Sequence, residues 1–318
     1  MKRVVVGFLV CMAGLCNGGE IPDLLISGYG SGATLIQGGE PVWNFRKGAM
    51  PCQDAWQLAD GTFLVPKSDT VRILTRDNKE LWKYQGETPA SMTTPPTDPK
   101  RLKKWKPRKL EIHSCQPLPG GKVLITEGLY GRFIEVDSKG EIVKIVKPEG
   151  EKANNHMFNR VVRKTKQGTY VATLTHDRVG EFDANGKMLR MVTQQTTEGS
   201  GIKWGHVHGL AVLDNGNWLI GTGAGACFFE IDKNDKIVWK LTPQDLPQMK
   251  VTYAAGAHRL KDGTTVVSVF RNEHPVFAVS RDKKVLWKLP KGKKYINGIT
   301  NVQVLNESGN PANFELQK

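Results

Sequence analysis

Short apolar runs alternate with turn signals along nearly the whole chain, and a glycine recurs in these turns at regular distances. The turn glycines are Gly61, Gly121, Gly168, Gly216 and Gly263, most of them preceded by Asp or Asn. Their separations are 60, 47, 48 and 47 residues. A period of about 40–50 residues built from short strands is typical of a β-propeller array.

Each period predicts four antiparallel strands, which together make one propeller blade. Asp-Gly or Asn-Gly between apolar runs is a strong hairpin signal, because Gly adopts positive φ without steric cost. The first complete unit predicts strands at 53–58, 62–65, 71–74 and 79–83.

The two ends of the chain predict one shared blade. Apolar runs at 23–27, 33–36 and 40–44 fit the second to fourth strands of a unit, and the missing first strand fits 300–305. A ring closed in this way leaves no open sheet edge. We therefore predict an all-β fold, a six-bladed β-propeller closed by the N- and C-terminal strands, as a single domain over 19–318.

The N-terminus has the pattern of a secretory signal peptide, which we place at 1–18. Lys2 and Arg3 precede an apolar run at 4–15, and small and turn-forming residues follow. No other stretch approaches the length of a membrane span. We expect an exported monomer, periplasmic or extracellular, without a transmembrane segment, and lipidation at Cys16 is the alternative.

The charge of the chain indicates an acidic partner. The formal net charge is +14, of which the leader carries two, leaving about +12. This excess favours an anionic small molecule or glycan, and export argues against nucleic acid. Beyond the leader the cysteines are Cys52, Cys115 and Cys227, an odd and sparse set that is no disulfide framework, although the first two begin neighbouring repeats and could pair.

Histidines recur where the first strand of a blade begins, and in a propeller these strands line the central axis. Gln53, His113 and His208 each stand eight residues before a turn glycine, and Ala255 breaks the series. His156 begins the fourth blade in a matching context. The remaining candidates for ligand binding near strand starts are His206, His258, Arg160 and Arg259.

These imidazoles allow two kinds of chemistry. They could bind a divalent metal ion in a central funnel. His113, His208 and His156 could instead act as nucleophile and general acid or base on an ester or glycosidic bond. A structural interpretation, in which each His caps a neighbouring loop, stays open beside them.

The longest interruption of the period is a basic, Pro-rich loop at 86–110. It joins one blade to the next and should emerge on the same face as His113. Lys104 and Trp105 could form a cationic rim, with the indole stacking on a sugar or aryl ring. The alternative is a solvated charged loop, since blocks of like charge repel one another.

One position near the end of each unit is most often tryptophan. This pattern, together with Asp-x-x-Gly turns at 137–140 and 183–187, resembles the tryptophan-docking repeat of pyrroloquinoline-quinone-type propellers. The resemblance implies a propeller in which the tryptophans pack against the next blade. The quinone-binding relatives have eight blades and a pair of adjacent cysteines, so we expect no pyrroloquinoline quinone here. The recurring position is occupied by Trp43, Trp82, Lys144, Arg190, Trp239 and Trp287.

The segments 113–121 and 208–216 follow the form His-x-x-x-x-Leu-x-x-Gly. They resemble the blade starts of bacterial arylsulfotransferase-like propellers. The resemblance implies that a funnel histidine, His113 or His208, takes up a sulfuryl group while His156 assists. In that family other His, Arg and Asn residues hold the sulfate, and Arg160 and Arg259 are the cations near these segments here.

Three functions are consistent with the sequence. The first is an exported propeller that binds an anionic small molecule or glycan in a His-lined funnel. The second is a sulfotransferase-like or glycan-cleaving enzyme that uses the funnel histidines. The third is a noncatalytic scaffold for another protein. The residues alone leave open whether the protein is an enzyme and whether it holds a metal ion.

Overall fold

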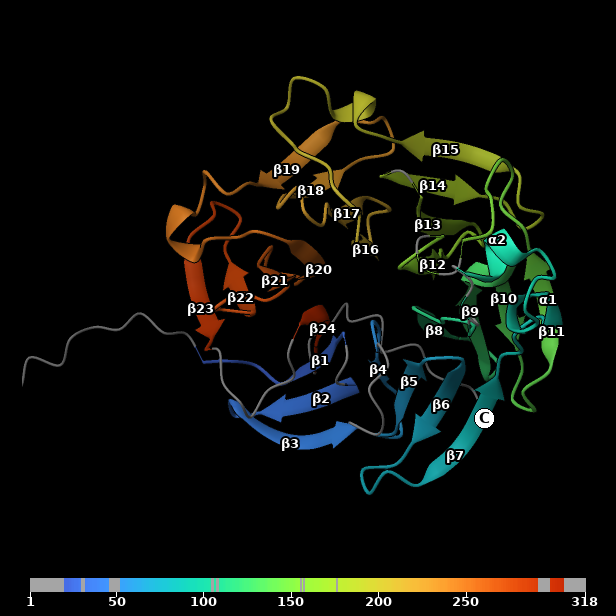
Figure 1. Cartoon of the computed structure of the whole chain (residues 1–318). Helices are drawn as coiled ribbons and strands as arrows, with labels where there is room; N and C mark the ends of the chain where they lie inside the picture. Colours follow the sequence, from blue (N-terminus) through green and yellow to red (C-terminus); the bar gives the residue numbers. More distant parts are fainter. Residues whose placement is uncertain are drawn as a thin grey trace, which may run out of the picture.

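The computed structural model confirms the six-bladed propeller: six four-stranded antiparallel sheets stand around a common axis (Figure 1). No helix within the described residues is long and apolar enough to cross a membrane. The predicted leader at 1–18 lies outside the described residues. Those residues are 20–29, 32–45, 52–103, 106, 109–154, 156, 158–175, 177–290 and 298–305.

One blade joins the two ends of the chain, as predicted. The C-terminal strand β24 is its innermost strand and pairs with β1, with Val304 opposite Leu24. This pairing closes the ring, because the N-terminal strands alone would leave β1 as an open edge. The blade consists of β24 (Ile299–Val304), β1 (Leu24–Gly28), β2 (Gly32–Gln37) and β3 (Glu40–Phe45).

The other five blades follow in chain order, each running from the axis outward (Figure 1). They are β4 (Trp56–Gln57), β5 (Phe63–Lys67), β6 (Thr70–Leu74) and β7 (Glu80–Gln85); β8 (Cys115–Leu118), β9 (Lys122–Glu127), β10 (Arg132–Val136) and β11 (Ile142–Val146); β12 (Val162–Lys164), β13 (Tyr170–Leu174), β14 (Arg178–Phe182) and β15 (Met188–Val192); β16 (Gly209–Val212), β17 (Trp218–Gly221), β18 (Phe228–Ile231) and β19 (Ile237–Leu241); and β20 (Ala254–Arg259), β21 (Thr265–Val269), β22 (Val276–Val279) and β23 (Val285–Leu289).

Helical turns occur only between strands in the described part of the chain. The loop predicted at 86–110 contains two of them, α1 and α2. The bounds are α1 (Ala90–Thr93), α2 (Pro99–Leu102), η1 (Gly128–Tyr130), η2 (Gln195–Thr197) and η3 (Pro247–Met249).

The turn glycines that set the period take the conformation for which glycine is required. A positive φ is costly for residues with a Cβ, so glycine allows the tight connection between the first two strands of a blade. The φ angles are 81° at Gly61, 70° at Gly121, 85° at Gly168, 83° at Gly216 and 88° at Gly263.

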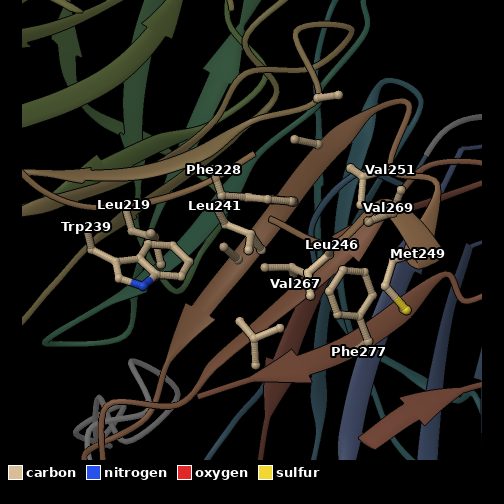
Figure 2. Close-up of a cluster of buried hydrophobic side chains, with 14 residues drawn as sticks. Leu219, Phe228, Trp239, Leu241, Leu246, Met249, Val251, Val267, Val269 and Phe277 are labelled. Carbon is tan, nitrogen blue, oxygen red and sulfur yellow. The ribbon is translucent and has the colours of Figure 1, made fainter. Parts of the chain in front are cut away.

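Apolar side chains fill the space between neighbouring blades. In Figure 2, Leu219 and Phe228 of the fifth blade in chain order lie against Val267 and Phe277 of the next, and Met249 of η3 covers the same cluster. Comparable clusters lie between the other blades. Contacts between adjacent sheets continue around the ring and return to β24.

The recurring outer-strand tryptophans pack as predicted. Trp43 in β3 stacks on Phe63 of the next blade, with ring centroids 3.8 Å apart. The indole Nε1 of Trp239 donates a hydrogen bond of 3.1 Å to the carbonyl oxygen of Arg281, also in the next blade. Arg190, which replaces the tryptophan in its unit, places its guanidinium 4.2 Å from the centre of the Trp218 ring. The repeat position therefore locks successive blades together.

Candidate functional site

Polar side chains meet where the innermost strands begin. These strands gather around the axis of the ring, so equivalent positions on neighbouring blades lie near one another (Figure 1). The position eight residues before the turn glycine is occupied by Gln53, His113, Arg160 and His208 in four successive blades. Hydrogen bonds and ring contacts join these side chains to three others. We call the whole group the axial cluster, and its members are Gln53, Glu111, His113, His156, Arg160, His208 and Tyr253.

Glu111 stands at the centre of the axial cluster. Its Oε2 lies 2.8 Å from Nδ1 of His156 and 3.1 Å from Nε2 of His113. The two imidazole rings are perpendicular, with centroids 5.7 Å apart. One carboxylate oxygen thus connects histidines that belong to adjacent blades.

The proton of His156 can be assigned from its partners. Nη2 of Arg160 lies 3.0 Å from Nε2 of His156. A guanidinium can only donate, so Nε2 must accept, and the ring proton sits on Nδ1. His156 therefore donates to Glu111 and relays a hydrogen bond from Arg160 to the carboxylate.

His113 is arranged differently. Its Nδ1 lies 3.2 Å from the carbonyl oxygen of Asn159, which can only accept, so Nδ1 carries a proton. Nε2 faces the Glu111 carboxylate. In a neutral ring that nitrogen is a second acceptor, and the contact is favourable only when a proton or another cation lies between the two atoms.

Burial and the contacts around Glu111 together set the protonation states in the axial cluster. Burial alone would raise the pKa of Glu111, but its interactions with His113 and His156 outweigh it and hold this pKa at about 2. Burial lowers the pKa of His113 and outweighs the opposing interaction with Glu111. Near neutral pH the carboxylate is therefore charged while the His113 ring resists taking up a second proton.

Arg160 brings a permanent positive charge to the axis. Its Nη1 donates to Oε1 of Gln53 over 3.4 Å, and its backbone N–H donates to Oγ1 of Thr173 over 2.9 Å. Burial lowers the pKa of Arg160, and the phenols of Tyr253 and Tyr29 oppose that shift. A guanidinium remains protonated in proteins, so the shift does not remove the charge.

His208 forms another wall of the axial cluster. It is buried, and its Nδ1 has no hydrogen-bond partner within the described part of the chain. The ring meets Tyr253 edge to face, with centroids 5.8 Å apart. Burial lowers the pKa of His208 well below its ordinary value, and the charge of Arg160 adds to this effect. His208 is therefore a neutral imidazole near neutral pH.

A second polar group lies beside the axial cluster along the same strands. Asp54 is fully buried and accepts two hydrogen bonds from Arg163, of 2.8 and 3.2 Å. Ser114 donates to the same carboxylate over 3.2 Å, and Asn301 of the closing strand donates over 2.7 Å. We call these four residues the Asp54 hub. It joins four blades across the axis.

The remaining predicted ligand-binding residues lie elsewhere or outside the described residues. His206 is exposed and has a φ of 60°. His258 lies in β20, where its Nδ1 accepts a 3.2 Å hydrogen bond from the backbone N–H of Val304 in β24. Arg259 pairs with Glu230 at 3.1 Å and covers the Trp239 ring at 4.7 Å. Lys104 and Trp105 are not among the described residues.

The sequence analysis did not predict Glu111 and Tyr253 as members of the site, and it named Arg160 without its place in the matched series. Arg160 stands eight residues before Gly168, so the same count that selects His113 selects it as the fourth member of the series. Glu111 stands two residues before His113, and it could have been found by asking which carboxylate accompanies each histidine. Tyr253 likewise stands two residues before Ala255. No comparable sequence signal pairs Asp54 with Arg163.

The three described cysteines do not contribute to the axial cluster. Cys52, Cys115 and Cys227 are all buried free thiols. Burial raises the pKa of each of them, which disfavours the reactive thiolate. The pairing considered for Cys52 and Cys115 is not formed.

Comparison with known proteins defines the class as a β-propeller and gives no closer assignment. No family model matches the chain, and no curated protein matches it. A Bacteroides caccae protein of unknown function is 22% identical, with a TM-score of 0.71, over 89% of this chain and 98% of that one.

Two lyase structures share the fold at lower identity. A streptogramin B lyase is 9% identical, with a TM-score of 0.58, over 87% of this chain and 82% of that one. A catalytically inactive His-to-Ala variant of virginiamycin B lyase from Staphylococcus aureus, solved with quinupristin, is 10% identical. Its TM-score is 0.57, and the alignment covers 89% of this chain and 92% of that one. At these identities the likeness establishes the fold alone.

Proposed function

We propose that the axial cluster binds an anionic small molecule or glycan, one that carries a carboxylate, sulfate or phosphate group. The observation that supports this most is the position of Arg160. Its guanidinium lies among side chains of several blades, where it donates hydrogen bonds to His156 and Gln53. A charged donor in a partly buried site forms stronger hydrogen bonds to an anion than a neutral donor does.

The neighbours of Arg160 fit the same ligand. His208 and Tyr253 offer an aromatic wall beside the guanidinium, which suits the apolar face of a sugar or a small ring. The formal net charge, about +12 without the leader, raises the local concentration of anions around the whole protein. We infer further that the protein is exported and acts as a monomer, which N-terminal sequencing of the mature protein and its mass in solution would test.

The test is a binding titration with anions of known chemistry. Isothermal titration with glucuronate and glucose 6-sulfate, and with glucose as the neutral control, should show binding of the anions only. Arg160→Gln should weaken this binding by about 10-fold to 100-fold, because a charge-assisted hydrogen bond is lost. Arg72→Gln is the matched control, since Arg72 pairs with Glu80 on an outer hairpin.

Two results would overturn this proposal. One is equal binding of glucose and its charged relatives. The other is an Arg160→Gln variant that binds the anions as tightly as the unmodified protein, with Arg72→Gln unchanged.

A second candidate is catalysis in the same site, by sulfuryl transfer or glycan cleavage. It is favoured by the arrangement of Arg160, His156, Glu111 and His113, in which His156 donates to Glu111 and Nε2 of His113 faces the same carboxylate, since such a set of groups can hold and move a proton. In the lyase solved with quinupristin, replacement of a histidine gives an inactive protein. Turnover of an aryl sulfate or an aryl glycoside that disappears in His113→Gln would support catalysis. Anion binding without turnover of either would support the binding function alone.

A further inference from the structure

The contact between Glu111 and His113 needs a positive species between its two atoms. Oε2 of Glu111 and Nε2 of His113 are 3.1 Å apart, and the Nδ1 proton of His113 is already directed to the carbonyl oxygen of Asn159. Two acceptors at this distance repel each other unless a proton or a metal cation lies between them. A third ligand atom, Nδ1 of His156, lies 2.8 Å from the same carboxylate oxygen.

The composition of this group selects the kind of cation. The three ligand atoms of Glu111, His113 and His156 lie within 4.8 Å of one another. Two imidazole nitrogens and one carboxylate oxygen suit Zn²⁺ and related transition metals, whereas Mg²⁺ and Ca²⁺ prefer oxygen ligands. Three protein ligands also leave a coordination position for a bound molecule.

We propose that Glu111, His113 and His156 hold a divalent transition-metal ion, bound through Oε2, Nε2 and Nδ1 respectively. In a tetrahedral zinc site neighbouring ligand atoms are about 3.4 Å apart, so the Glu111 carboxylate would move back by roughly half an ångström. The side chains of Glu111 and His156 are 25% and 45% exposed, which gives the carboxylate room to move and the ion a path. His113 is buried and fixed by Asn159, so it supplies the rigid ligand.

This proposal rests on the proposed anion site and adds a coupling to it. A metal ion on Nδ1 of His156 displaces the proton from that nitrogen to Nε2. Nε2 then becomes a donor and faces the guanidinium of Arg160, which is also a donor. The hydrogen bond between them is lost, and the Nη2 donor of Arg160 that made it can turn to a ligand. The metal ion and the guanidinium would then hold the same anionic group from two sides.

Metal binding is tested first without any anion. Isothermal titration of chelator-treated full-length protein with Zn²⁺ should show one ion per chain, and Mg²⁺ under the same conditions should show no comparable binding. Glu111→Gln and His113→Gln should each weaken Zn²⁺ binding at least about 10-fold, since each removes one of three ligands. His274→Gln is the matched control, because His274 precedes β22 and lies outside the axial cluster.

Arg160→Gln separates the metal site from the anion site. Removal of the guanidinium should strengthen Zn²⁺ binding, because the hydrogen bond that holds His156 in the wrong tautomer is gone. The same variant should lose anion binding. In the unmodified protein, Zn²⁺ binding without any binding of the anions would contradict the proposed function and leave the metal site intact.

The metal proposal is overturned if the protein binds no Zn²⁺, or if Glu111→Gln and His156→Gln bind it as tightly as the unmodified chain. His156 is half-exposed, so His156→Gln should fold even if the change at buried His113 does not. The absorption spectrum of bound Co²⁺ gives an independent measurement. A tetrahedral spectrum that disappears in both variants is expected, and a spectrum identical in all variants would place the ion elsewhere.

Discussion

The axial cluster and the Asp54 hub are built from similar groups and lie beside each other on the same strands, yet they are paired in opposite ways. In the hub, each oxygen of Asp54 accepts from several donors, including the bidentate Arg163. In the axial cluster, Nε2 of His113 faces a carboxylate, and Nδ1 of His208 has no partner within the described residues. Buried polar groups in folded proteins are normally satisfied. We infer that the hub holds the blades together and that the polar groups of the axial cluster are completed by a bound ligand.

The largest expected effect tests the inference that the Asp54 hub stabilises the fold. Asp54→Asn keeps the shape of the side chain but leaves the buried charge of Arg163 without its counter-ion. Breaking a buried ion pair in this way costs about 3–5 kcal/mol, so the free energy of unfolding should fall by that amount in a urea titration. Asp214→Asn is the control, because its partner Lys166 is exposed and such pairs contribute about 1 kcal/mol or less.

Equal losses in Asp54→Asn and Asp214→Asn would remove the distinction between the two regions. The ion pair between Asp54 and Arg163 would then contribute no more to stability than an exposed ion pair does. A loss confined to Asp54→Asn supports its role as the connection among four blades.

The next effect concerns a buried histidine that serves the fold. Burial lowers the pKa of His258 from 6.5 to about 4. The folded state therefore resists protonation more than the unfolded chain does. The contribution of neutral His258 to the free energy of unfolding is complete above about pH 6.5. As the pH falls from there toward 4, the unfolded chain takes up the proton first, and about 3 kcal/mol of this free energy is lost. Burial lowers the pKa values of His113 and His208 as well, and these residues add to the loss in the same direction.

Urea titrations at several pH values check this prediction. His258→Gln removes the titrating group, so its difference in unfolding free energy from the unmodified protein should shrink by about 3 kcal/mol between pH 6.5 and 4. A difference that stays constant over that range would mean that His258 is not held neutral between β20 and β24.

The sequence was sufficient to predict the blades because the period depends on local chemistry. A tight turn requires positive φ, so Gly61 and its equivalents mark each unit, and the apolar runs around them predict the strands. The closing strand near 300–305 was predicted for the same reason: one unit lacked its first strand. Outer-strand tryptophans such as Trp43 were correctly interpreted as packing.

The site was only partly predictable, because its contacts join blades that lie far apart in the sequence. The matched count before the turn glycine selected His113 and His208, yet Glu111 matters through His156 of the next blade. His258 was predicted to bind a ligand because it lies near the start of a strand. It lies three positions beyond Ala255, past a bulge in β20, and contacts β24 instead.

The smallest expected effect concerns Asn159, whose backbone carbonyl oxygen accepts from His113 of the axial cluster. It has the opposite sign to the effects above, because the free energy of unfolding should rise. Both polar atoms of the Asn159 side chain are buried and have no hydrogen-bond partner within the described residues. Because a buried unsatisfied group is unfavourable, Asn159→Leu should raise the free energy of unfolding by about 1 kcal/mol or leave it unchanged. Asn217→Leu should lower it by about 1 kcal/mol, since Asn217 donates to Glu230 over 2.8 Å. A region that becomes more stable when a polar side chain is removed is one whose polarity serves binding. If Asn159→Leu instead destabilises the protein as much as Asn217→Leu does, the side chain of Asn159 beside the axial cluster is as well satisfied as that of Asn217, and it gives no support to the contrast between the two regions.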